Sequence, residues 1–151
     1  MRSILFVCAG NICRSPIAEA LFGRIAKGRG ALASLEVGSA GTLALEGNPP
    51  TAEAIRASRE EFGLEIAAHR ARNISGLDAD LILTMDHMVR REVSGMRLRG
   101  RVELLGDYAG TGEIVEDPYG CPGEVYRACA RHLEELLRAA ADRLERELEA
   151  R

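Results

Sequence analysis

The sequence predicts an α/β fold: a single-domain open parallel sheet of about four strands with helices on both faces. Short apolar runs alternate with segments of helical periodicity along the chain, which is the pattern of parallel strands joined by crossover helices. A length of 151 residues suits one domain and is short for two. No linker rich in Pro, Gly or Ser divides the chain, so we expect residues 1–151 to form one domain.

The first strand and the helix after it are the most strongly marked elements. Ile4–Val7 is an uninterrupted apolar run that ends just before a cysteine, as expected of a strand buried on both faces. Ser15 and Pro16 mark the start of a helix, because Ser favours a helix cap and Pro favours the first turn. We therefore expect a strand at Ile4–Val7 and a helix at Pro16–Gly28.

The later elements continue this alternation. Further strands are expected at Leu35–Val37, Leu81–Leu83 and Val102–Leu105, and further helices at Thr51–Phe62, His87–Val93 and about Gly123–Glu149. Apolar residues recur at helical spacing in the last helix, and we expect Cys129 among its core residues. Tyr119, just before this helix, and Tyr126, within it, are expected at the surface.

Composition excludes several classes of function. Hydrophobic residues make up 46% of the chain and charged residues 28%, which is typical of a globular protein. The N-terminal apolar run is too short for a signal peptide, and no run approaches the roughly 20 residues of a membrane span. We therefore expect a cytoplasmic location and no membrane partner. A formal charge of −3 argues against general nucleic-acid binding.

The cysteines and histidines do not form a metal-binding pattern. The four cysteines include no Cys-x-x-Cys pair, and the three histidines are not spaced around them as zinc ligands would be. We therefore expect no metal, no other cofactor, and thiols that stay reduced.

The most informative motif follows the first strand and reads Cys8-Ala9-Gly10-Asn11-Ile12-Cys13-Arg14-Ser15. A strand that stops at a cysteine and a helix that starts soon after it would surround one point with backbone N–H groups, which favours phosphate. Gly10 and Asn11 tolerate the left-handed backbone that such a ring requires. Arg14 carries a planar group that can bind two phosphate oxygens at once. The motif therefore predicts a phosphate-binding loop.

The position of Cys8 also suggests chemistry. The positive field that binds phosphate favours a thiolate and makes the sulfur nucleophilic, and Ser15 can donate a hydrogen bond to it. The alternative is a buried structural cysteine followed by an ordinary helix cap. The whole motif in one register after a strand favours the nucleophile.

Other polar residues are expected at the same edge of the sheet. Ligands of open parallel sheets bind at the carboxyl ends of the strands, where the Cys8 loop lies. Thr42 and Asp86 follow the second and third expected strands and are candidates for this edge. Glu19 is a weaker candidate for a functional residue, because a carboxylate in the first turns of a helix is electrostatically favourable whatever its function.

These features resemble the low-molecular-weight protein tyrosine phosphatase family. Its signature is a Cys, five residues and Arg-Ser-Pro near the N-terminus, as at Cys8 and Arg14 here. Later segments match the family's landmarks in order, so that the resemblance covers nearly the whole chain: Ser39–Thr42, Gly47–Pro50, His69–Arg72, Met85–Asp86, Val102–Gly106 and Glu116–Tyr119.

The resemblance implies hydrolysis of a phosphomonoester in two steps. Cys8 is implied as the nucleophile, Arg14 as the phosphate clamp, and Asp117 as the general acid and base. Taken alone, the Asp117-Pro118 pair would be an ordinary turn. The implied phosphate and substrate contacts are Ala9, Gly10, Asn11, Ile12, Cys13, Ser15 and Tyr119.

The resemblance also implies supporting roles around the loop. Asn11, Ser39 and His69 match positions that hold the loop in shape through hydrogen bonds. Cys13 is implied to form a reversible disulfide with Cys8, which would switch the enzyme off and protect Cys8 from irreversible oxidation.

The substrate is expected to be a phosphorylated protein. Many family members grip a phenyl ring with additional aromatic residues, whereas this chain has Gly120 after Tyr119 and Leu43 and Leu45 after the second strand, which leaves one aromatic wall. Related protein-arginine phosphatases share the Asp-Pro-aromatic-Gly turn but have Thr at the position of Ile12. Because Ile12 offers no hydroxyl to a phosphoramidate, we favour phosphotyrosine and keep phosphoarginine as the alternative.

Two other classes fit less well. Thiol-dependent arsenate reduction needs relay cysteines in the middle of the chain, whereas Cys121 and Cys129 follow the acid loop. A phosphopeptide-binding module without turnover would need neither a reactive Cys8 nor Asp117. The sequence leaves the oligomeric state open.

Overall fold

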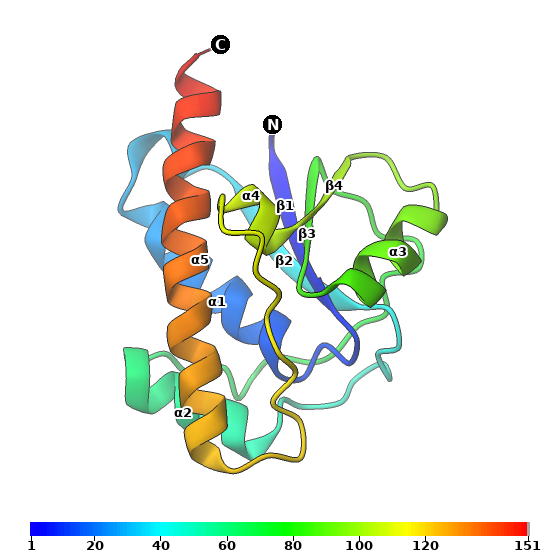
Figure 1. Ribbon diagram of the computed structural model, residues 1–151, viewed down its shortest axis with the longest axis vertical. Coiled ribbons are helices and arrows are strands. Elements are labelled where there is room, and N and C mark those ends of the chain that lie inside the picture. The colour runs from blue at the N-terminus through cyan, green and yellow to red at the C-terminus, as the bar shows by residue number, and fades with distance from the viewer. Residues whose placement is uncertain (151) are drawn as a thin grey trace.

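A computed structural model describes residues 1–150 and shows an open sheet of four parallel strands. The strands are β1 (Ser3–Cys8), β2 (Glu36–Gly41), β3 (Leu81–Thr84) and β4 (Arg101–Leu104), in the spatial order β2-β1-β3-β4 (Figure 1). This arrangement confirms the predicted fold class. The central position of β1 places Cys8 between the carboxyl ends of β2 and β3.

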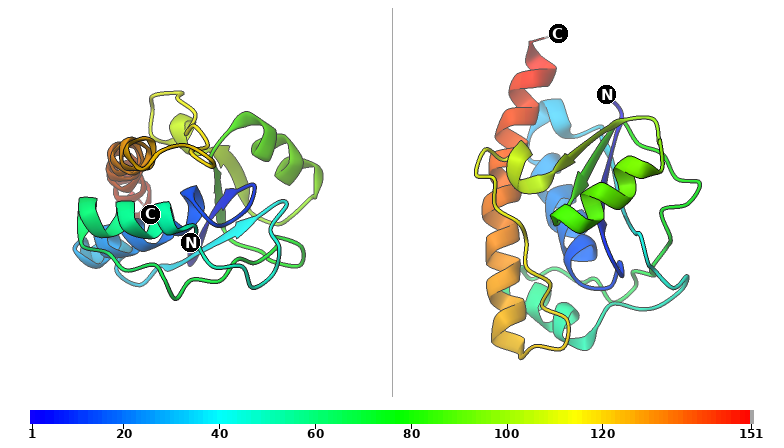
Figure 2. Two further views of the ribbon diagram at one scale, coloured as in Figure 1. Left: turned by 90° about the horizontal axis from the view of Figure 1, so that it is seen from below. Right: turned by 45° about the vertical axis from the view of Figure 1, so that its right-hand side comes forward.

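Helices cover both faces of this sheet. They are α1 (Arg14–Lys27), α2 (Ala52–Phe62), α3 (His87–Gly95), the short α4 (Leu105–Tyr108) and α5 (Gly123–Glu149), with a 3₁₀ turn, η1, at Gly30–Leu32. Figures 1 and 2 show α1 and α5 on one side of the sheet and α3 on the other. The N-terminal part of α5 also packs against α2. No helix within residues 1–150 is long and apolar enough to cross a membrane.

Alternation along β1 separates two hydrophobic clusters. Ile4, Phe6 and Cys8 belong to the larger cluster, which contains the buried faces of α1 and α5. Leu5 and Val7 belong to the smaller cluster beneath α3. Side chains of a strand point to opposite faces in turn, so a strand buried on both faces must be apolar throughout. Cys8 therefore ends β1 on the α1 side.

Several boundaries differ from those expected from the sequence. Helix α1 begins at Arg14 rather than Pro16, because the N–H groups of a first turn have no intrahelical partner and Pro is tolerated there. Strand β2 continues to Gly41, since its last residues pair with β1 although they are small or polar. Leu105 begins α4 instead of ending β4.

The last helix shows the expected burial with one exception. Cys129 lies in the core, as expected. Tyr126 was expected at the surface, and this expectation is wrong: its side chain is buried where α5 passes Cys13 and Thr51. Tyr119 is exposed.

Gly106 is required by a close approach of two backbone segments. A Cβ atom at Gly106 would lie 1.8 Å from the carbonyl oxygen of Glu113, whereas one at Gly23, inside α1, would meet nothing within 4 Å. We predict that Gly106→Ala lowers the free energy of unfolding by about 2 kcal/mol or more. As its matched control, Gly23→Ala should raise that free energy by about 0.5–1 kcal/mol. Urea unfolding of both variants measures the difference, and equal stability of the two would contradict this packing.

Candidate active site

The loop between β1 and α1 is shaped by one residue in the left-handed backbone conformation. Asn11 has a φ of 57°, as expected from its tolerance of this region. Gly10 was expected to share that conformation, and this expectation is wrong, because Gly10 is absent from the positive-φ residues of the described chain. The loop instead requires a glycine at Gly41, because its backbone passes close to that residue. A Cβ at Gly41 would lie 2.4 Å from the carbonyl oxygen of Ala9 and 3.0 Å from the nitrogen of Asn11.

Every polar group of the Asn11 side chain is used to hold this conformation. Its Nδ2 donates to Ser15 Oγ (2.8 Å) and Ser39 Oγ (3.0 Å), and its Oδ1 accepts from the backbone N–H of Arg72 (3.0 Å). Its carbonyl oxygen lies 2.9 Å from His69 Nε2. Residues from β2 and from the segment before β3, Ser39 and His69 among them, thus contact the loop.

The network extends outward from Ser39. Its hydroxyl donates to Glu19 Oε1 (2.5 Å), and its carbonyl oxygen accepts from Arg72 Nε (2.9 Å). Glu19 projects from α1 and Arg72 from the segment before β3. The backbone and side chain of Ser39 are therefore held from two directions.

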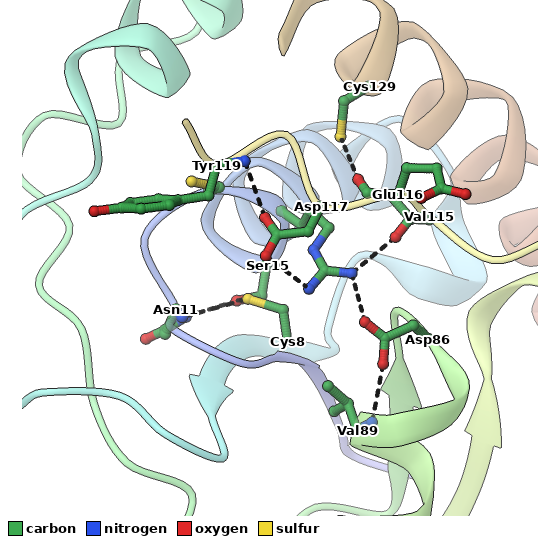
Figure 3. A network of polar contacts seen from close by, with 12 residues as sticks. Cys8, Asn11, Ser15, Asp86, Val89, Val115, Glu116, Asp117, Tyr119 and Cys129 are labelled. Carbon is green, nitrogen blue, oxygen red and sulfur yellow. Dashed lines mark hydrogen bonds and ion pairs between the residues drawn. The ribbon is translucent and has the colours of Figure 1, made fainter. Parts of the chain in front are cut away.

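Cys8 lies at the centre of the loop. Its Sγ is 2.9 Å from Ser15 Oγ and accepts a hydrogen bond from the backbone N–H of Asn11 at 3.3 Å. Figure 3 shows the side chains of Cys8, Asn11 and Ser15 gathered in the loop. The backbone N–H of Asn11 donates to the sulfur, and the hydroxyl of Ser15 is within hydrogen-bond distance of it.

Arg14 is buried, and its hydrogen bonds to the protein come from one nitrogen of its guanidinium group. Its Nη1 donates to Asp86 Oδ2 (2.8 Å) and to the carbonyl oxygen of Val115 (2.8 Å). Its Nη2 lies 3.8 Å from Asp117 Oδ2, and its Nε has no hydrogen-bond partner within residues 1–150. One edge of the guanidinium group is therefore held by the protein, and the Nε–Nη2 edge is available to two oxygens of a phosphate.

The charge on Arg14 is supported by its neighbours. Burial by itself would lower the pKa of Arg14, but the nearby Cys8, Asp86 and Asp117 outweigh burial and raise it. A buried cation with a free edge is a strong site for an anion, because few water molecules compete there.

Asp86 links Arg14 to α3. It caps the helix by accepting a hydrogen bond from the N–H of Val89 (2.9 Å), while its other oxygen binds Arg14. Partial burial would raise the pKa of Asp86, but these two hydrogen bonds outweigh it and hold the pKa below its ordinary value. Thr42, the other candidate at this edge, contributes a backbone N–H bond to the carbonyl oxygen of Cys8 (3.1 Å).

Asp117 lies at the mouth of the pocket. Its side chain is 51% exposed, and its Oδ1 accepts a hydrogen bond from the N–H of Tyr119 at 3.1 Å. The turn leaves Oδ2 directed toward Arg14. The acid loop thus reaches the Cys8 loop although more than a hundred residues separate them in sequence.

A cavity of about 230 Å³ contains these groups. Its lining residues are Cys8, Ala9, Gly10, Ile12, Cys13, Arg14, Leu43, Asp117 and Tyr119. Asn11, Ser15, Ser39 and His69 lie behind this lining and support it. Leu45 is not part of this lining.

Two further cysteines have raised pKa values: Cys13 in the wall of the cavity and Cys129 in the core. Burial raises the pKa of Cys13 despite hydrogen-bond contacts of its sulfur with Tyr126 (3.5 Å) and Thr51 (3.6 Å). Burial also raises the pKa of Cys129 to about 12. Both residues are therefore thiols at neutral pH.

Some important contacts could not be found in the sequence. Val115 binds Arg14 through its carbonyl oxygen, and every residue has such a group, so no sequence signal exists. The same holds for the backbone N–H of Arg72. Asp86 had a usable signal, since it lies two residues after the end of β3 and directly before α3.

The pocket combines a phosphate-sized anion site with a sulfur atom and a carboxyl group in its walls. A cysteine-dependent phosphatase uses these groups. Comparison with known proteins identifies the family. A family model described as low molecular weight phosphotyrosine protein phosphatase matches residues 3–150, and the chain belongs to this family of phosphoric monoester hydrolases.

Relatives with two different named activities are similar to the chain. A protein-arginine-phosphatase of Bacillus subtilis is 36% identical over 148 residues, which cover 95% of this chain and 97% of the relative. A human low molecular weight phosphotyrosine protein phosphatase is 37% identical over 144 residues, which cover 86% and 90%. A solved structure of a YwlE arginine phosphatase mutant with a phosphorylated active-site serine has a TM-score of 0.85 and 34% identity, and the match covers 97% of this chain and 99% of that one.

The Asp86–Arg14 pair should make stability depend on pH. Because the pKa of Asp86 is lowered in the folded state, ionised Asp86 contributes stability above the ordinary aspartate pKa of about 4 and loses that contribution as the pH falls through the lowered value. We predict that Asp86→Asn lowers the free energy of unfolding by about 2 kcal/mol at pH 7 and that the difference shrinks toward zero at about pH 2.

Urea unfolding of the wild type and Asp86→Asn over this pH range measures the effect. Asp107→Asn, at an exposed aspartate in α4, is the matched control and should change stability little at either pH. A difference for Asp86→Asn that is the same at both pH values would contradict the role of its charge.

Proposed function

We propose that this protein hydrolyses phosphotyrosine in protein substrates through a phosphocysteine at Cys8. The observation that carries the proposal is the free Nε–Nη2 edge of Arg14, which borders the same cavity as the sulfur of Cys8 and the carboxyl group of Asp117. A phosphate bound to that edge and to the loop N–H groups lies beside the sulfur, with the leaving group directed toward the mouth.

In the first step, the Cys8 thiolate attacks phosphorus in line with the tyrosine oxygen. The sulfur–phosphorus bond forms and the bond from phosphorus to the tyrosine oxygen breaks. Asp117, in its protonated form, gives its proton to the departing oxygen. Arg14 and the loop N–H groups stabilise the charge on the three remaining phosphate oxygens.

In the second step, water attacks the phosphocysteine from the side that the tyrosine has left. Asp117, now ionised, accepts a proton from this water, and the new oxygen–phosphorus bond displaces the Cys8 thiolate. Ser15 Oγ, 2.9 Å from the sulfur, stabilises the thiolate as it leaves. Inorganic phosphate is released and the enzyme returns to its starting state.

The walls of the cavity favour an aromatic leaving group. Ile12, Leu43 and the exposed ring of Tyr119 line its mouth and offer apolar surface to a phenyl ring. Ile12 has no hydroxyl to bind the nitrogen of a phosphoramidate. These features support phosphotyrosine as the preferred substrate.

Phosphoarginine is the second candidate. The turn after Tyr119 contains Gly120 with a φ of +81°, so that no second aromatic side chain closes the pocket. The similar Bacillus subtilis protein is named for activity on protein arginine. The mechanism at Cys8 would be the same, with nitrogen as the leaving atom.

Other expectations from the sequence remain predictions. A disulfide between Cys8 and Cys13 would inactivate the enzyme reversibly, and a cytoplasmic location would keep both thiols reduced. Arsenate reduction is less well supported, because Cys129, one of the two available relay cysteines, is buried with its pKa raised to about 12.

The substrate preference is tested with peptides that differ only in the phosphorylated residue. We predict that kcat/KM for a phosphotyrosine peptide exceeds that for the matched phosphoarginine peptide at least about tenfold. Cys8→Ser should abolish turnover, and Asp117→Asn should lower kcat about 100-fold or more.

The residue at position 12 provides the sharper comparison, because Thr and Val have nearly the same shape. Ile12→Thr should shift the ratio toward phosphoarginine, whereas Ile12→Val should not. A wild-type preference for phosphoarginine would contradict the proposed substrate and leave the cysteine mechanism intact. Binding of both peptides without release of phosphate would contradict the proposed enzyme activity.

A further inference from the structure

Three of the most exposed large apolar side chains line the phosphate pocket or a second hollow beside it. Leu43, Leu45, Met88 and Tyr119 are each more than 60% exposed. Leu43 and Tyr119 line the phosphate pocket itself, and Met88 lines a second hollow beside it. Apolar surface in contact with water at a binding site indicates that a partner covers it.

The second hollow lies on the far side of Asp117 and has a volume of about 420 Å³. It shares Ala9, Arg14 and Asp117 with the phosphate pocket. Its other lining residues are Asp86, His87, Met88, Val89, Ile114, Val115 and Glu116. Figure 3 shows Asp86, Val89 and Val115 on this side of the network. The two pockets are therefore adjacent, with Asp117 in the wall of both.

The charges at the base of the hollow are already paired. Asp86 and the carbonyl oxygen of Val115 both accept hydrogen bonds from Nη1 of Arg14, and the other oxygen of Asp86 accepts the N–H of Val89. The free edge of Arg14 belongs to the phosphate pocket. A second anion would thus find no unpaired donor of Arg14 here, whereas Met88, Val89 and Ile114 offer apolar walls.

We propose that this hollow binds a bulky apolar side chain that flanks the phosphorylated residue of the protein substrate. The proposal rests on the proposed function, because it assigns a second contact to the same substrate. An extended chain rises about 3.3 Å per residue, so two pockets that share walls are spanned by a few residues. We therefore place the apolar side chain within three positions of the phosphorylated residue, on one side of it.

A set of phosphotyrosine peptides tests this subsite. The reference peptide carries glycine at the three positions on either side, and each test peptide replaces one glycine with leucine. We predict that leucine at one position raises kcat/KM about fivefold over the reference. Phenyl phosphate, which has no flanking residues, reports the activity of the phosphate pocket alone.

Variants of Met88 test whether the preference for leucine arises in the hollow. Met88→Ser should lower the ratio of kcat/KM between the preferred leucine peptide and the glycine peptide to about one, and Met88→Leu should preserve the ratio. Met96→Ser is the matched control, because Met96 ends the same helix, is also exposed and does not line the hollow. It should leave the ratio at its wild-type value.

Three results would overturn the proposal. The first is that leucine has no effect at any position, and the second is that Met88→Ser and Met96→Ser change the ratio equally. The third is that Met88→Ser alters the sedimentation of the protein without altering the ratio, which would make the hollow a contact between copies of this chain. Failure of the proposed substrate is distinguished by hydrolysis of phenyl phosphate without hydrolysis of any phosphotyrosine peptide. The same leucine series in phosphoarginine peptides then tests whether the hollow binds a flanking apolar side chain.

Discussion

The site depends on the left-handed conformation of Asn11 and on the hydrogen bonds that hold it there. A non-glycine residue in this region is strained unless its surroundings support it. Here the side chain of Asn11 binds Ser15, Ser39 and the backbone of Arg72, and its carbonyl oxygen lies against His69. The turn brings the N–H of Asn11 onto the sulfur of Cys8. Contacts from three parts of the chain thus prepare one atom for reaction.

Arg14 connects this loop to the rest of the fold. The edge that binds Asp86 and Val115 is fixed by α3 and by the segment leading to the acid loop. The N–H of Val115 binds the carbonyl oxygen of Met85 at 2.9 Å, which ties that segment to the end of β3. The same contacts that orient Arg14 therefore bring Asp117 to the pocket. Because these groups are held in place before substrate arrives, little reorganisation is needed when charge develops on the phosphate.

Local sequence signals predicted the Cys8 loop, because an apolar strand, Asn11 and a Ser-Pro helix start are adjacent in the chain. They failed where the structure depends on contacts between distant segments. The full length of β2 was missed, since Ser39, Ala40 and Gly41 are not an apolar run although they pair with β1. The backbone donor of Arg72 and the acceptor of Val115 have no side-chain signature. Asp117 was placed only by family resemblance, because no periodicity relates it to Cys8.

The most direct measurement of the central claim is to trap the covalent intermediate. With nitrophenyl phosphate, whose leaving group needs little help from an acid, Asp117→Asn should form the phosphocysteine readily and hydrolyse it slowly, because the base for water is missing. Rapid quenching and mass spectrometry of the digested protein should then find phosphate on the peptide that contains Cys8, and none in Cys8→Ala combined with Asp117→Asn. Phosphate on another residue, or turnover without a covalent species, would contradict the mechanism.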